Sequence, residues 1–153
     1  MLSKIFRHDC IYVRPEAGIS QPADLRGERV GLPQYSSTAG VFIKGLVQHE
    51  YGVGPTEISW FMGGQDTPAP APLVPLDLPA DINLEFIPEG ETLEGMLTAD
   101  ELDAFFATYI PNLFLNGSPK IARFFPNFKE VEQDYYRRIG IFPIMYTVVV
   151  RED

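Results

Sequence analysis

The chain has 153 residues, which is the length of about one domain. Twelve lysine and arginine residues against 21 aspartate and glutamate residues give a formal net charge of −9 at pH 7. This acidic balance argues against binding to nucleic acid or to anionic lipid, because both require a basic face. A hydrophobic fraction of 45% is enough for a packed core and argues against global disorder.

Short apolar runs alternate with helix-like patterns along the chain, and glycine and proline residues separate them. Strands are expected at 11–13, 29–32, 57–61, 83–87, 104–106 and 144–150. Helical segments are expected at 22–27, 39–51, 92–97 and 128–138. The last strand has a continuous β-branched run, which predicts burial on both of its faces. Strands that alternate with helices predict an α/β fold with a mostly parallel sheet flanked by helices.

Charged residues are unevenly distributed along the chain. Residues 45–119 contain no lysine or arginine and twelve acidic residues. An anion-binding site must therefore use backbone amides or residues from the two ends. Within the acidic stretch, residues 67–79 are rich in proline, which favours an extended excursion between two elements of one domain. We expect residues 1–153 to form that single domain.

Several classes of protein and site are excluded by what the sequence lacks. A single cysteine, Cys10, allows neither an intramolecular disulfide nor a CxxC pair, and we expect it to be a small buried hydrophobic residue. No glycine-rich phosphate loop, GxSxG elbow or HExxH zinc motif occurs, so no metal site is expected. The first residues lack a signal-peptide core, and the weakly polar run 139–150 is too short for a membrane span. We expect a cytoplasmic location without membrane insertion, or a periplasmic one if the natural start lies upstream.

The segment 32–38 leaves an expected strand and opens an expected helix. Free backbone N–H groups and the positive end of the helix dipole meet at such a point. Three hydroxyl side chains there can cap the helix or bind a carboxylate or phosphate: Ser36, Ser37 and Thr38. Ligands of open α/β sheets bind beyond the carboxyl ends of the strands, where this loop is expected. The loop is therefore a candidate anion site, with ordinary helix capping as the alternative.

His8 is the best titratable candidate for acid–base chemistry, because imidazole changes its charge near neutral pH. It stands between Arg7 and Asp9, and a neighbouring arginine suits a substrate that carries a carboxylate. A surface position without a function is the alternative for His8. His49 falls on an expected helix, where we expect it to be packed or solvated.

Four motifs occur in a characteristic order: Phe6-Arg7-His8, PADLRGERVG at 22–31, Tyr-Tyr-Arg-Arg at 135–138 and Gly-Ile-Phe-Pro-Ile-Met at 140–145. Together they resemble the 4,5-dihydroxyphthalate decarboxylase family, which has the type II periplasmic-binding-protein fold. The second motif is common to solute-binding proteins, whereas the last two are more specific. The resemblance implies that the chain is a second lobe only, from a longer protein that holds its ligand between two lobes.

The family implies a decarboxylation of 4,5-dihydroxyphthalate to 3,4-dihydroxybenzoate and CO2. Protonation of a carboxyl-bearing ring carbon gives a dienone, so the ring itself accepts the electrons and no cofactor is expected. Our hypothesis is that His8 donates the proton and that Arg7, Ser37 and Thr38 anchor the carboxylate of a small aromatic acid. Ser36 is a further candidate for substrate binding.

At two further positions that we expect to contact substrate, the chain departs from the family pattern. Tyr109 stands where arginine is usual, and Tyr146 stands where histidine is usual. Both can donate hydrogen bonds, but neither supplies charge near neutral pH. Two other functions therefore stay open: a non-catalytic solute-binding lobe of an ABC-type uptake system for a small organic anion, or a fragment without a ligand. A lone lobe exposes an apolar face, so self-association or pairing with the missing lobe is expected.

Overall fold

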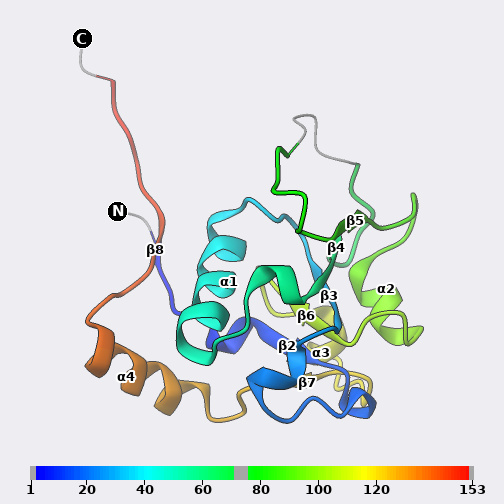
Figure 1. The fold of residues 1–153 in the computed structure, drawn as a ribbon, viewed down its shortest axis with the longest axis horizontal. Coiled ribbons are helices and arrows are strands. Elements are labelled where there is room, and N and C mark those ends of the chain that lie inside the picture. The colour runs from blue at the N-terminus through cyan, green and yellow to red at the C-terminus, as the bar shows by residue number, and fades with distance from the viewer. Residues whose placement is uncertain (1–2, 71–75, 152–153) are drawn as a thin grey trace.

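The computed structural model describes residues 3–70 and 76–151 (Figure 1). Its strands are β1 (Ser3–Lys4), β2 (Ile11–Val13), β3 (Arg29–Leu32), β4 (Ser59–Met62), β5 (Leu84–Phe86), β6 (Ala104–Phe106), β7 (Ala122–Arg123) and β8 (Ile144–Tyr146). Its α-helices are α1 (Thr38–Tyr51), α2 (Leu93–Thr98), α3 (Asn112–Leu115) and α4 (Phe128–Ile139). Single 3-10 turns form η1 (His8–Cys10), η2 (Pro15–Ala17), η3 (Pro22–Leu25) and η4 (Pro55–Glu57). Every expected strand and helical segment has a counterpart, whereas β1, β7 and α3 are not among the expected elements.

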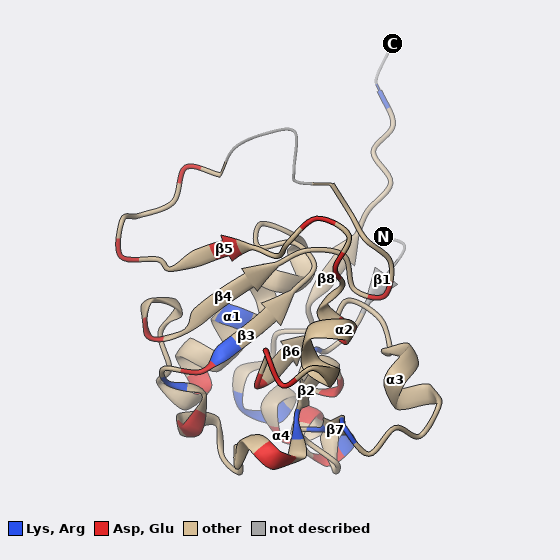
Figure 2. Ribbon diagram, turned by 90° about the vertical axis from the view of Figure 1, so that its right-hand side faces the viewer, with Lys and Arg blue, Asp and Glu red and all other residues tan. Residues whose placement is uncertain are grey.

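Six strands form the main sheet in the order β5-β4-β3-β6-β2-β7. The first four are parallel: β3 pairs with β4 on one side and β6 on the other, and β4 pairs with β5. β2 runs antiparallel to both of its neighbours, β6 and β7. The strands β3 and β4 lie side by side in Figure 2. The predicted α/β fold with a mostly parallel sheet is confirmed, and the carboxyl ends of four strands meet at one edge.

Side chains of the central strands alternate between the two faces of the sheet, as the two-residue period of a strand requires. In β6, Phe106 packs in one buried cluster and Phe105 in the other. Ile43 of α1 belongs to the first cluster and Leu97 of α2 to the second. Helices therefore cover both faces of the sheet, which explains why its central strands are almost entirely apolar.

The helix α1 begins and ends where local signals place it. Ser37 is the N-cap, and its hydroxyl accepts a hydrogen bond of 3.1 Å from the N–H of Gly40. Gly52 closes the helix with a left-handed backbone (φ 71°), and its N–H donates to the carbonyl of Gln48. Glycine adopts this conformation without steric cost. The helix runs from Thr38 to Tyr51, so the predicted helix 39–51 is confirmed to within one residue.

The expected buried strand at 144–150 is wrong in its extent and in its burial. Only Ile144–Tyr146 is a strand, and it pairs antiparallel with β1 in a separate two-stranded sheet. Val149 and Val150 are 88% and 81% exposed. The β-branched run indicates a preference for extended backbone but does not choose a partner strand. β1 and β8 instead leave the main sheet together (Figure 1).

The expected proline-rich excursion at 67–79 is described only in part. Residues 67–70 and 76–79 contain no helix or strand, and residues 71–75 lie outside the described residues.

Among the described residues, no helix has the length and apolar character needed to cross a bilayer.

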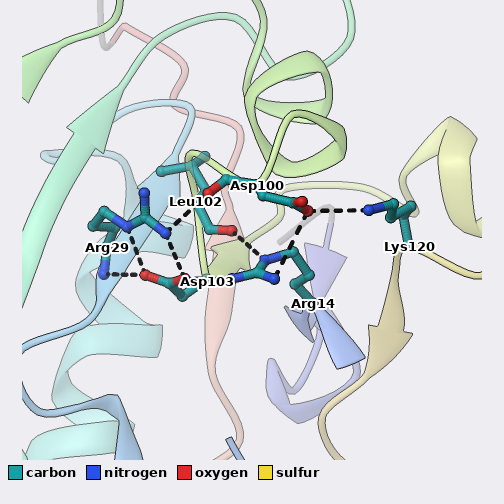
Figure 3. A network of polar contacts seen from close by, with 6 residues as sticks. All are labelled: Arg14, Arg29, Asp100, Leu102, Asp103 and Lys120. Carbon is teal, nitrogen blue, oxygen red and sulfur yellow. Dashed lines mark hydrogen bonds and ion pairs between the residues drawn. The ribbon is translucent and has the colours of Figure 1, made fainter. Parts of the chain in front are cut away.

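A polar network holds together the amino ends of the parallel strands, at the edge opposite their carboxyl ends (Figure 3). Asp103, 5% exposed at the start of β6, accepts two side-chain hydrogen bonds of 2.8 Å from Arg29. Arg14 donates to the same carboxylate at 2.9 Å. Burial alone raises the pKa of the Asp103 carboxyl, but the arginine hydrogen bonds outweigh it and hold that pKa well below its ordinary value. The network thus ties together β3, β6 and the end of β2.

Replacement of Asp103 by asparagine is expected to lower the free energy of unfolding by about 2 kcal/mol, because two arginines lose a buried counter-ion. The matched control is Glu57→Gln, whose partner Arg26 and own side chain are 44% and 41% exposed. Because exposed ion pairs contribute little to stability, its cost is expected to be clearly smaller than that of Asp103→Asn. Urea unfolding at pH 7 measures both. Because the pKa of the Asp103 carboxyl is lower in the folded than in the unfolded chain, its charged form stabilises the fold above the ordinary aspartate pKa. The difference in unfolding free energy between wild type and Asp103→Asn must therefore shrink as the pH falls below about 4. Equal effects of the two substitutions would contradict the proposed importance of the network.

Candidate functional site

Two neighbouring cavities lie beyond the carboxyl ends of the parallel strands. The first, here called the polar cavity, has a volume of about 510 Å³ and lies beyond β3 and β6. The second, here called the apolar cavity, has a volume of about 440 Å³ and lies beyond β3, β4 and β5. Pro33 and Gln34 line both cavities. Ligands of open α/β sheets bind at this edge because loops that follow parallel strands converge there.

The loop between β3 and α1 forms one wall of the polar cavity. Ser36, Ser37 and Thr38 all line it. Ser37 uses its hydroxyl within the loop, accepting from Gly40 and donating to the Gln34 carbonyl at 2.9 Å. Ser36 and Thr38 are exposed, so their hydroxyls can reach a ligand. The first-turn N–H groups of α1 also require partners outside the helix. Ser37 thus caps the helix, while the hydroxyls of Ser36 and Thr38 remain open to the cavity.

Arg7 enters the polar cavity from the segment between β1 and η1, and it is only 6% exposed. Its guanidinium donates to the sulfur of Met145 at 3.2 Å and to the carbonyl of Thr108 at 3.3 Å. The Cys10 sulfur lies 3.6 Å from it. In the part of the chain that the structure describes, no carboxylate forms an ion pair with Arg7. A buried cation with such weak acceptors favours an anion in the cavity.

The two tyrosines of the expected site lie in different places. Tyr146 of β8 lines the polar cavity and is 65% exposed. Tyr109 does not line it, because its hydroxyl donates to the carboxylate of Asp66 at 2.8 Å. Desolvation and this carboxylate raise the pKa of Tyr109 to about 12. Tyr109 therefore belongs to a hydrogen-bonded cluster with Asp66 rather than to the cavity wall.

His8 does not line the polar cavity; together with Arg7 it lines a separate cavity of only about 10 Å³. The imidazole is 1% exposed and contacts the rings of Phe125 and Tyr135 edge-on, with centroids 5.5 and 5.4 Å away. Its Nδ1 is 3.9 Å from Oε1 of Glu132, and among the described residues neither ring nitrogen has a hydrogen-bond partner. Desolvation lowers the pKa of His8 to about 4. The side chain is therefore a neutral, buried group at pH 7, and the alternative of a surface histidine is wrong.

The geometry brings together Arg7, Ser36, Ser37, Thr38 and Tyr146, and leaves out His8 and Tyr109. The sequence analysis missed Thr108 and Met145, which also line the polar cavity. Thr108 comes two residues after β6, so the rule that sites follow parallel strands could have found it. Within residues 3–70 and 76–151, no group of three or more His, Cys, Asp and Glu side chains is arranged to hold a metal ion.

The burial of His8 predicts an abnormal titration. In the His49→Gln variant only one of the two histidines remains, and its imidazole proton signal is expected to titrate with a pKa of about 4. Because the pKa of His8 is lower in the folded than in the unfolded chain, its contribution to stability is lost as the pH falls from about 6.5 toward 4. An NMR titration from pH 8 to below the expected midpoint, to about pH 3, measures the pKa. A midpoint near 6.5 would show that His8 is solvated.

No family model matches the chain. A 4,5-dihydroxyphthalate decarboxylase from Comamonas testosteroni is 37% identical over 150 residues, which cover 98% of this chain and 46% of that protein. A second, from Pseudomonas putida, is 36% identical over 138 residues, which cover 90% of this chain and 54% of that protein. The chain thus spans about half the length of the curated relatives it matches, and the predicted resemblance is confirmed. The chain is therefore similar to the 4,5-dihydroxyphthalate decarboxylases, and it corresponds to about half of their length.

Proposed function

We propose that the chain supplies one wall of the ligand site of a decarboxylase-like protein that converts 4,5-dihydroxyphthalate to 3,4-dihydroxybenzoate and CO2. The observation that carries the proposal is the buried Arg7, which lines the polar cavity and pairs with no carboxylate in the described part of the chain. The names of the two relatives support the choice of substrate. A substrate carboxylate would complete the hydrogen bonding of this guanidinium and of the first turn of α1.

Charge strengthens the case for an anion at this position. The chain carries a net charge of −9, so its surface as a whole repels anions at long range. Arg7 and the amino end of α1 nevertheless present positive charge to the polar cavity. Such a local reversal of sign is expected where an anionic ligand binds.

The reaction requires three groups around the aromatic ring. A donor protonates the carboxyl-bearing carbon while a base takes the proton from the para hydroxyl, which gives a dienone. The bond to the carboxylate carbon then breaks, CO2 leaves, and the electron pair returns to the ring. The second carboxylate must be held throughout, and Arg7 with Ser36 and Thr38 can hold it. His8 does not line this cavity, so the proposal gives it no contact with substrate from this wall.

We also propose that residues 1–153 form one lobe and that the remainder of the length found in the relatives supplies the opposite wall. β1 and β8 lie side by side, and Tyr146 of β8 lines the polar cavity. Chain that continues from these strands would therefore leave close to the cavity. Pairing with such a second lobe, or with another copy of this chain, would cover the exposed valines that follow β8.

A second candidate function is non-catalytic binding of a small organic anion. It is favoured by one observation: the cavity joins a cation with hydroxyls, while the buried His8 does not line it. Titration of the chain with 4,5-dihydroxyphthalate, with ligand and amide signals followed together, tests both functions. Product formation supports the decarboxylase over the binding lobe, whereas binding at residues 36–38 without product supports the anion site that both functions share. No ligand-dependent change at all would contradict both.

The role of Arg7 is tested by Arg7→Met. Loss of a charge-assisted hydrogen bond to carboxylate is expected to weaken phthalate binding about tenfold or more, as measured by NMR titration at fixed salt. Arg137→Gln is the matched control, because it removes one positive charge from an exposed position on α4. Arg7→Lys keeps the charge but loses the planar fork, and should give an intermediate affinity. Equal affinities of wild type and Arg7→Met, with both chains folded, would overturn the proposed anchor.

A further inference from the structure

The apolar cavity is the feature that the proposed function leaves unused. It adjoins the polar cavity along Pro33 and Gln34, which line both. Its volume of about 440 Å³ exceeds what one substituted benzene ring requires. The two cavities follow neighbouring parallel strands, so together they form one cleft with a basic half and an apolar half.

The walls of the apolar cavity suit an aromatic ring. Met62 and Phe86 end β4 and β5, and both line it together with Ile87. Phe86 is 51% exposed although it is a large apolar side chain. Gly63 lines the cavity as well, and a Cβ atom there would collide with the side chain of Ile87. The absence of a side chain at Gly63 thus lets Ile87 pack against the backbone and leaves the cavity open.

One acidic residue lines the apolar cavity among the described residues. Glu89, three residues after β5, lines the cavity and is exposed. Among the described residues, no ion pair or side-chain hydrogen bond to another residue is formed by its carboxylate. A carboxylate is an acceptor only, so it favours a ligand group that donates hydrogen bonds and disfavours a second anion.

We propose, on the basis of the proposed function, that the two cavities together bind one ligand and that each recognises a different end of it. The carboxylate edge lies in the polar cavity, at the loop after β3 and within reach of Arg7, and the ring lies in the apolar cavity against Phe86. The opposite edge offers its hydroxyls to Glu89, which makes Glu89 a residue that determines specificity.

The spacing of the strands agrees with the length of a dihydroxylated aromatic acid. Adjacent strands lie about 4.8 Å apart, so the carboxyl ends of β3 and β5 are separated by about 10 Å. A benzene ring with a carboxylate and a para hydroxyl, and with a hydrogen bond of about 2.8 Å at each end, spans a similar distance. One dihydroxylated aromatic acid can therefore contact both the loop after β3 and the loop after β5.

The test compares three probes that differ only at the edge opposite the two carboxylates. Phthalate has hydrogen atoms there, 4,5-dihydroxyphthalate has two hydroxyls, and benzene-1,2,4-tricarboxylate has a third carboxylate. Glu89→Gln is compared with Glu85→Gln, which removes the same charge from β5 at an exposed position outside the cavity lining. Affinities are measured by NMR titration of the 153-residue chain.

Glu89→Gln is expected to weaken binding of the dihydroxy ligand about fivefold, to leave phthalate unchanged, and to strengthen binding of the tricarboxylate. Glu85→Gln should change none of the three. If phthalate binds through Arg7 but the two glutamate variants behave alike toward the dihydroxy ligand, the role of Glu89 is overturned and the proposed function stands. If none of the probes binds, or if Arg7→Met has no effect on them, both proposals are overturned.

Discussion

The parallel alignment of β5, β4, β3 and β6 is the constraint on which the rest of the structure depends. Parallel strands place all of their carboxyl ends at one edge, and the loops that follow them must converge there. Both cavities lie at this edge. The opposite edge holds the Asp103 network, which joins β3, β6 and the end of β2 (Figure 3). The amino edge therefore stabilises the sheet, while the residues at the carboxyl edge remain available to bind a ligand.

Burial of charge distinguishes these two edges. At the amino edge, Asp103 is satisfied by two arginines, so its charge is fully used within the fold. At the carboxyl edge, Arg7 is just as deeply buried, but among the described residues its guanidinium donates to sulfurs and a backbone carbonyl and to no carboxylate. A buried charge without an opposite charge is costly, so this position favours an anionic ligand. The contrast between Asp103 and Arg7 is the physical basis for proposing an anion site at the carboxyl edge.

Predictions from local signals agree with the structure, and those that needed a distant partner do not. The cap at Ser37 and the stop at Gly52 lie next to the helix that they delimit, so α1 was predictable. The run 144–150 looked like a buried strand, but its burial depended on which strand it would meet, and β1 is that partner. His8 was predicted from its neighbours in sequence, whereas the rings of Phe125 and Tyr135 that enclose it come from far along the chain.

The sequence by itself determined the alternation of strands and helices, the caps of α1, the resemblance to the decarboxylases and half of the residues that line the polar cavity. The alternation and the caps depend on spacing and on residue types within a few positions of one another. Only the tertiary structure decided that Tyr109 donates to Asp66, that His8 is buried away from the lining of the polar cavity, and that Glu89 lines a second cavity. Those outcomes follow from contacts between segments that are distant in the chain, and a pattern of neighbouring residues carries no information about such contacts.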